Sequence, residues 1–188
     1  MSAVHVEDSD RRRGPSLRVR RYTEGDWPPV LAMLRATFAS GDTYAYPPDL
    51  DDEEIRHAWI KTPQATFVAC VHSDGDGDGD GGGRVVGTYA LKPNQPGSGS
   101  HVANAGYVVA PGARGRGVAT AMCEHSQAEA RRLGFRAMQF NLVVSTNETA
   151  VALWRRLGFD VVGTLPGAFR HARLGYVDAY VMFKTLVG

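Results

Sequence analysis

The stretch of sequence that decides the fold is GYVVAPGARGRGVAT, residues 106–120. It opens as an apolar strand, passes through the glycine-rich segment 114–117, and enters an amphipathic helix predicted over 117–133. Glycines let the backbone approach an oxyanion closely, and the first N–H groups of a helix lack intrahelical partners. The helix dipole adds about half a positive charge at that end. This strand-to-helix junction is therefore predicted to bind an anion, with phosphate as the natural ligand.

Three phosphate-binding motifs compete for this loop, and their residue requirements separate them. A Walker-type loop needs lysine and then serine or threonine after its second glycine, but Val-Ala follows Gly117, which disfavours nucleoside triphosphate hydrolysis. A dinucleotide fingerprint would place Thr120 where a third small residue belongs, and the next strand carries Asn141 instead of an acid. The pattern that fits is Arg-x-x-Gly-x-Ala, with Arg114 and Ala119 at its ends.

This pattern resembles that of the GNAT acyltransferase superfamily, which uses Arg/Gln-x-x-Gly-x-Gly/Ala to hold the pyrophosphate of coenzyme A. A second segment, from Asn147 to Phe159, is similar to the last conserved helix of that family, which ends in Gly-Phe before a strand. The resemblance covers residues 17–186. It implies an acetyl-CoA-dependent N-acyltransferase.

Hydrophobic periodicity and breaker residues predict eleven elements in the order β-α-α-β-β-β-α-β-α-β-β. This order gives an α/β (α+β) fold with a mixed sheet and helices on both faces, and the resemblance implies that the sheet is mostly antiparallel. We expect one domain over 17–188, a disordered tail over 1–16, and a flexible Asp/Gly loop over 73–83. Loops are predicted at 41–48 and 166–175. The Asp/Gly loop copies the opening of a calcium loop, but Val85 stands where a glutamate is required, so no metal is expected.

Composition excludes several classes of partner. The chain has 21 basic and 20 acidic side chains, for a net charge of +1, so no global field exists to hold nucleic acid or an anionic membrane. No apolar run reaches the roughly 18 residues of a membrane span. Cys70 and Cys123 lack the spacing of a disulfide framework or zinc site, which suits a reduced, cytoplasmic protein. A monomer and a homodimer are both left open.

The resemblance, carried over position by position, assigns the cofactor site. It implies that the backbone of Val108 and Val109 pairs with the pantetheine arm, that one strand amide polarises the thioester carbonyl, and that Asn147 contacts the cofactor. Asn147 also suits a helix cap. The predicted cofactor-binding residues are Val108, Val109, Arg114, Gly115, Arg116, Gly117, Val118, Ala119, Thr120 and Asn147.

The catalytic groups are less defined. The family commonly places a tyrosine at the position of Trp154, where its hydroxyl protonates the departing thiolate; an indole is no practical acid, so another side chain or water must supply that proton. For the base we consider His101 and His171, although histidines also cap or bridge loops. Asn141 is the first candidate for a catalytic or substrate-orienting group.

Asn104 and Tyr46 are candidate substrate-binding residues, and each also has a structural interpretation as a buried amide or an edge tyrosine. We expect the acceptor to be the primary or secondary amine of a small molecule, an amino acid or analogue, because the segment around Asn141 resembles acyltransferases that acetylate amino acids. The long loops are suited to closing over a small molecule. The alternatives are acetylation of a protein or peptide and a non-catalytic acyl-CoA sensor.

Overall fold

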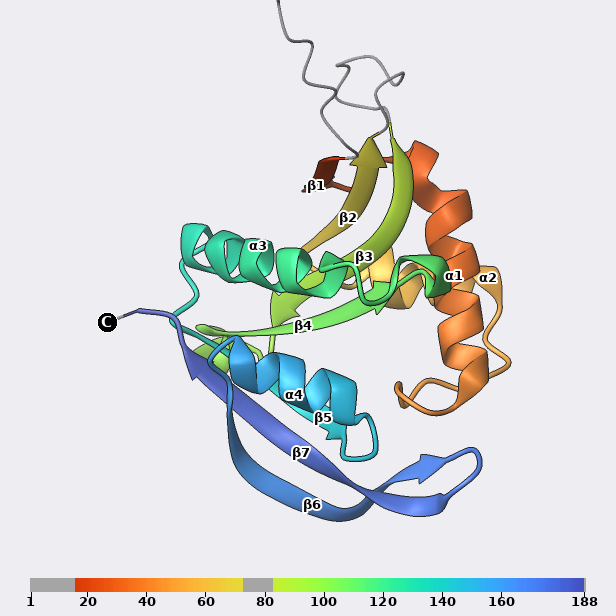
Figure 1. Cartoon of the computed structure of the whole chain (residues 1–188). Coiled ribbons are helices and arrows are strands. Elements are labelled where there is room, and N and C mark those ends of the chain that lie inside the picture. The colour runs from red at the N-terminus through yellow and green to blue at the C-terminus, as the bar shows by residue number, and fades with distance from the viewer. Residues whose placement is uncertain (1–15, 73–82, 188) are drawn as a thin grey trace, which may run out of the picture.

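The computed structural model of the chain describes residues 16–72 and 83–187 (Figure 1). The predicted tail (1–16) and flexible loop (73–83) therefore lie outside the described residues, except that Ser16 begins the first strand and Gly83 leads into the third. The helices and longer strands, in chain order, are β1 (Ser16–Arg21), α1 (Trp27–Ser40), α2 (Asp52–Arg56), β2 (Ala65–His72), β3 (Arg84–Pro93), β4 (Val102–Val109), α3 (Val118–Arg132), β5 (Ala137–Val144), α4 (Glu148–Arg156), β6 (Asp160–His171) and β7 (Gly175–Thr185).

The seven strands form one sheet in the order β1-β2-β3-β4-β5-β7-β6. Neighbouring strands are antiparallel except β4 and β5, which are parallel. Helices α3 and α4 cover one face and α1 and α2 the other, as Figure 1 shows. The predicted fold, a mixed and mostly antiparallel sheet between two helical layers, is confirmed.

Two buried clusters lie on the two faces of the sheet. Beneath α3 and α4, side chains such as Met122 and Trp154 share a buried cluster with Tyr89, which is fully buried. Beneath α1 and α2, Leu34 and Trp59 pack on the opposite face. Alternate residues of each strand serve the two clusters, so each central strand reads as an almost continuous apolar run.

The entry to α1 is fixed by a buried ion pair. Asp26 does not cap the helix with its side chain, as the sequence suggested; its carboxylate instead accepts from the Thr23 amide at 2.8 Å and from both terminal nitrogens of Arg20 at 2.7 Å. Burial by itself raises the pKa of Asp26, but the hydrogen bonds from Arg20 and Thr23 outweigh burial and lower it. Strand β1 and helix α1 are thereby tied together.

Two predicted boundaries differ from the structure. The helix predicted after Asp51 widens into a π-helical turn over His57–Lys61, where the Thr62 amide donates to the His57 carbonyl. The segment 166–175, predicted as a loop, is a β-hairpin instead. Its strands skip register between Leu165 and Phe169, and the Gly167 amide there donates to Asp178 at 2.9 Å.

Candidate active site

The sheet opens between β4 and β5. Their parallel ladder ends at Ala103 and Met138, and the Asn104 side-chain amide then bridges the strands by donating to the Gln139 carbonyl at 3.0 Å. Beyond that bridge lies a cleft of ≈ 1380 Å³, lined by residues from both strands, from the loop before α3, from α1, α4 and from the β6–β7 hairpin. The elements predicted to bind the cofactor and the acceptor thus meet in one cavity.

The free edge of β4 offers alternate backbone groups to this cleft. Ala110 donates to β3 at 2.9 Å, and the register of β3 with β4 continues from there without a shift. Hydrogen-bonded pairs recur at every second residue, so Val108 directs its N–H and C=O toward β3, while Tyr107 and Val109 direct theirs toward the opening. The Tyr107 carbonyl accepts the Tyr44 hydroxyl at 3.0 Å on that side. Of the two valines predicted to pair with the cofactor, Val109 is therefore the one with a free backbone edge.

The loop between β4 and α3 has the form of an anion site. Gly115 and Gly117 have φ of +73° and +77°, and at neither position would a Cβ have an atom within 4 Å. The first intrahelical bond of α3 runs from the Ala121 amide to the Gly117 carbonyl at 3.0 Å. Residues 118–120 line the cleft, and their amides precede that bond, so no carbonyl of the helix is available to them and an external anion can take that place.

Two arginines of this loop differ in placement. Arg114 is exposed and lines the cleft, as does Arg156 at the end of α4. Arg116 is exposed and lies outside the set of lining residues, so its predicted contact with the cofactor is limited to its backbone or to a phosphate at the rim.

Asn147 occupies the start of α4 and lines the same cleft. Its side-chain oxygen accepts from the Ala150 amide at 3.2 Å, which is a helix cap. The side chain is half-buried, so the cap and a contact with the cofactor are compatible, as the sequence predicted.

Trp154 lines the inner wall of the cleft and is 8% exposed. Its ring lies 5.0 Å from that of Tyr107 and 5.1 Å from that of Phe140. The Tyr107 hydroxyl is 2.6 Å from Ser126 Oγ, and burial raises its pKa well above the usual value. Neither side chain is a ready proton donor, so this wall shapes the cleft without supplying an acid.

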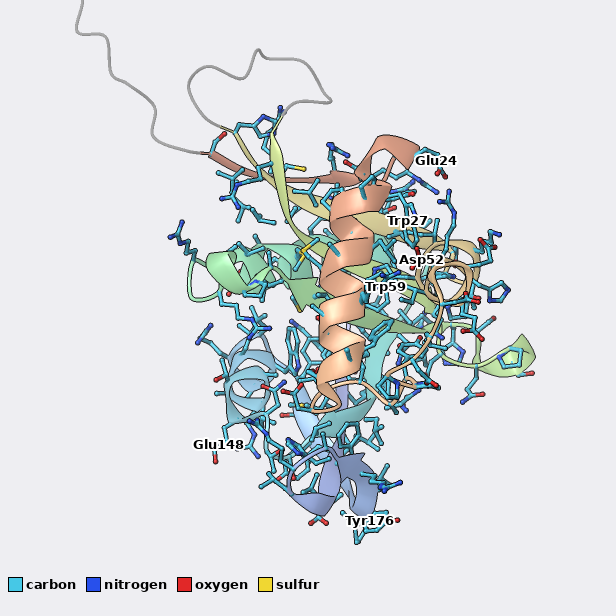
Figure 2. All side chains as sticks on the ribbon, turned by 90° about the vertical axis from the view of Figure 1, so that its right-hand side faces the viewer. Glu24, Trp27, Asp52, Trp59, Glu148 and Tyr176 are labelled. Carbon is cyan, nitrogen blue, oxygen red and sulfur yellow. The ribbon has the colours of Figure 1, made fainter. Side chains whose placement is uncertain are left out.

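An aromatic cluster covers β4 on the α1/α2 face. Tyr44 and Tyr46 stack with centroids 6.2 Å apart, and Phe38 lies 4.5 Å from Tyr46. A Cβ on Gly106 would lie 3.0 Å from the Tyr44 hydroxyl and 3.1 Å from Trp59, so glycine lets both rings approach the strand. Figure 2 shows Trp59 beside α1. The predicted substrate residue Tyr46 lines the cleft, and Tyr44, which the sequence did not single out, reaches the free edge of β4.

The tip of the β6–β7 hairpin lines the cleft and contacts the end of α1. The Ala172 amide donates to the carbonyl of Gly41, after α1, at 2.9 Å. His171 is 7% exposed and lines the cleft, and its Nδ1 accepts from the Arg173 amide at 3.1 Å. His171 therefore lies in the cleft with one ring nitrogen engaged by the hairpin backbone, and its role as a base stays a prediction.

The other predicted polar residues divide between the cleft and the scaffold. Asn141 is exposed in the cleft, and its Oδ1 accepts from Gln139 at 2.8 Å. Asn104 lines the cleft too, but its amide nitrogen is engaged in the bridge to β5. His101 is exposed at the opposite end of β4, where its Nδ1 donates to the Ser98 carbonyl at 3.1 Å. The structure therefore places His101 outside the candidate site.

Besides Arg156, three charged residues that line the cleft were not singled out from the sequence, namely Asp42, Lys92 and Arg173. Asp42 accepts from the Ser40 hydroxyl at 2.6 Å. The three come from separate segments and belong to no local motif. The one available signal was Lys92, a charged residue at the end of an otherwise apolar strand pattern.

Comparisons with known proteins agree with this geometry. The model of the acetyltransferase (GNAT) family matches residues 27–159. The chain is 39% identical over 98 residues to the N-acetyltransferase aca1 of Schizosaccharomyces pombe, which is 52% of this chain and 47% of that protein. The chain thus spans about half the length of this curated relative.

Solved structures extend the similarity to nearly the whole fold. A GCN5-related N-acetyltransferase from Kribbella flavida is 46% identical, with a TM-score of 0.81 over 90% of this chain and 97% of that one. The putative acetyltransferase yncA from Salmonella typhimurium, solved with its cofactor acetyl-CoA, has a TM-score of 0.76 at 19% identity, over 92% and 95% of the two chains. The second likeness concerns the fold alone. Because the family model matches residues 27–159, which is most of the chain, the chain belongs to the acetyltransferase (GNAT) family.

Proposed function

We propose that the protein is an acetyl-CoA-dependent N-acetyltransferase that acetylates the amine of a small molecule, an amino acid or a close analogue. The observation that carries this proposal is the cleft between β4 and β5, which joins a free strand edge to the open N-terminus of α3. When bound, acetyl-CoA supplies the acetyl thioester and leaves as the free thiol.

On the cofactor side, the binding groups are mostly backbone. The N–H of Tyr107 and the N–H and C=O of Val109 are placed to pair with an amide-bearing arm as an added strand would, while the Tyr107 carbonyl accepts from Tyr44. The amides of residues 118–120 and the side chain of Arg114 are placed to hold a pyrophosphate. One of the β4 amides would stabilise the negative charge that develops on the carbonyl oxygen during attack.

On the acceptor side, the amine must be neutral when its nitrogen attacks, forming the C–N bond as the C–S bond breaks. Asp42 is the one carboxylate among the described residues that line the cleft. We therefore propose that Asp42 binds the ammonium form of the acceptor and that the proton of this ammonium leaves to water. Tyr44 lies beside the free edge of β4, where its hydroxyl is placed to orient the amine. Because Trp154 cannot protonate the thiolate, that proton is assigned to water.

Enclosure of the cleft supports a small acceptor. The hydrogen bond between Ala172 and Gly41 joins the hairpin to the end of α1, and a Cβ on Gly41 would lie 3.1 Å from that of Ala172. An extended peptide acetylated at an internal lysine needs a channel open at both ends, and we infer that this contact narrows one of them.

The proposal is tested by free-thiol release from acetyl-CoA with a panel of amino acids, small amines, polyamines and peptides. Acetyl-CoA binding without turnover on any acceptor would sink the enzyme proposal in favour of a sensor. Turnover confined to peptides would sink the small-molecule acceptor.

No helix among the described residues is long and apolar enough to cross a membrane. A cytoplasmic location stays a prediction, to be checked by fractionation of the native host, and light scattering decides between a monomer and a homodimer.

A further inference from the structure

A row of polar side chains crosses three strands at the point where the sheet opens. Lys92 on β3 lies opposite Asn104 on β4. Asn104 bridges to Gln139 on β5, whose side-chain amide donates to Asn141 at 2.8 Å. We call Lys92, Asn104, Gln139 and Asn141 the polar row. By the two-residue period of a strand, Lys92 shares a face with Ala90, which packs in the α1/α2 cluster, so it is on the acceptor side of the sheet.

The charges that line the cleft are unequal. Among the described residues that line it, four are cationic (Lys92, Arg114, Arg156 and Arg173) and one, Asp42, is a carboxylate. Arg114 and Arg156 belong to the pyrophosphate loop and to α4, on the cofactor side. Lys92 and Arg173 come from β3 and the hairpin tip, on the acceptor side. The acceptor half therefore holds one carboxylate that can bind an ammonium, Asp42, and two cationic side chains, Lys92 and Arg173.

Lys92 is half-buried, and its side-chain ammonium takes part in no ion pair or hydrogen bond found among the described residues. The other lysine of a central strand, Lys184, shows the contrast, since it donates to Gln127 at 2.5 Å and to the Leu157 carbonyl at 2.6 Å. An ammonium that faces a cavity without a partner favours an anion there, because the anion replaces lost solvation with a charge-assisted hydrogen bond.

We propose that the acceptor amine carries a carboxylate and that Lys92 binds this carboxylate, with Asn141 as a second donor. This inference rests on the proposed function and names the substrate class of the same site. Asn104, the partner of Lys92, lies three residues before Tyr107, about 10 Å along the strand. The flexible stem of Lys92 shortens that span, so an amine at the free edge of β4 and a carboxylate at Lys92 fit one small amino acid.

Asn141 completes the recognition. Its Oδ1 accepts from Gln139, which directs the Nδ2 donor away from that contact. Arg173 at the hairpin tip adds a second positive charge on the same side. An acceptor with one ammonium and one carboxylate matches the charges of Asp42 and Lys92, whereas a polyamine would bring its further cations against Lys92 and Arg173.

The test compares amino acids with their carboxamides, which keep the amine and lose the anion. Thiol release is measured for the twenty amino acids, their amides, and a polyamine panel, using wild type, Lys92→Gln, Lys92→Arg and Lys61→Gln. Lys61 is an exposed surface residue outside the cleft and serves as the matched control. Acetyl-CoA affinity is measured separately by calorimetry.

We expect wild type to prefer an amino acid to its amide. Lys92→Gln should raise the KM for that amino acid about 10- to 100-fold, the loss of one hydrogen bond to a charged group, and abolish the preference over the amide. Lys92→Arg should restore part of it, and acetyl-CoA affinity should not change. Turnover that favours amides or polyamines, an unchanged KM in Lys92→Gln, or acetyl-CoA binding with no amino acid turned over would each overturn the proposal. If the wild-type protein does not bind acetyl-CoA, the proposed function itself is refuted.

Discussion

Replacing Gly117 with aspartate separates anion binding from folding. Gly117 has φ of +77°, and no atom lies within 4 Å of the place a Cβ would take, so the substitution strains the backbone without crowding it. The left-handed conformation costs an L-residue about 1–2 kcal/mol, with aspartate among the more tolerant types. A carboxylate at the N-terminus of α3 regains about 0.3–1 kcal/mol from the helix dipole. The variant should therefore lose at most about 2 kcal/mol of folding stability.

The same carboxylate would oppose a bound pyrophosphate. At about 5 Å, two like unit charges repel by about 0.8 kcal/mol at a dielectric constant near 80 and by about 3.3 kcal/mol near 20. The Kd for acetyl-CoA should rise about 4- to 250-fold, and the rise should shrink at high ionic strength. Calorimetric titration with acetyl-CoA at low and high salt measures both effects.

Gly134, at the other end of the same helix, is the matched control. It has φ of +88° and equally open space around a Cβ. An aspartate there meets the negative end of the dipole, so Gly134→Asp should be the less stable variant in urea while acetyl-CoA affinity stays at the wild-type value. Normal acetyl-CoA binding by Gly117→Asp, or equal weakening in both variants, would refute the placement of the pyrophosphate.

Three further outcomes follow from other contacts. The pKa of Asp26 is lowered in the folded state, so its contribution to stability is present above its ordinary pKa and lost as pH falls through the folded value. Asp26→Asn should therefore weaken the loss of stability at acid pH that urea unfolding measures. An unchanged loss at acid pH would contradict the role of the bonds between Asp26 and Arg20. Trp154→Phe should cost about 1–3 kcal/mol in unfolding measurements and leave the pH profile of kcat unchanged, whereas a shifted profile would make the indole part of the proton path. Gly41→Ala should raise the acceptor KM and spare acetyl-CoA affinity, because its Cβ would press on Ala172; equal effects on both would argue against closure of the acceptor end by the hairpin.

Much of the fold could be predicted because its signals are local. The loop from Arg114 to Ala119 and the helix after it are contiguous in sequence, and apolar periodicity located the strands that flank them. The hairpin at 166–175 could not be found in this way, because Pro166 and Gly167 punctuate the sequence as a loop would. The ladder resumes beyond them at Phe169 and Val177, and within the irregular stretch the Gly167 amide donates to the side chain of Asp178, eleven residues away.

In the candidate site, too, residues in contiguous motifs could be predicted and residues brought together from separate segments could not. Asn147 was identified because it belongs to a contiguous motif with the helix it caps. Asp42, Lys92 and Arg173 come together from three segments, and only the sheet order and the hairpin tip bring them to one cleft. His101 was misplaced for the converse reason: it is close in sequence to the free edge of β4 but lies at the end of the strand where β4 and β5 are still paired.

One half of the cleft offers mainly backbone groups and the other mainly side chains, and this difference decides what family membership can predict. In the proposed site the cofactor half consists mainly of backbone amides on β4 and α3, which many side chains can accompany, so a short glycine pattern is enough to predict the donor. The acceptor half consists of side chains, and replacing Lys92 or Asn141 alters its charge or its hydrogen bonds without moving a strand. Family membership therefore predicts how the acetyl group arrives here, whereas the acceptor must be inferred from the polar row of this chain.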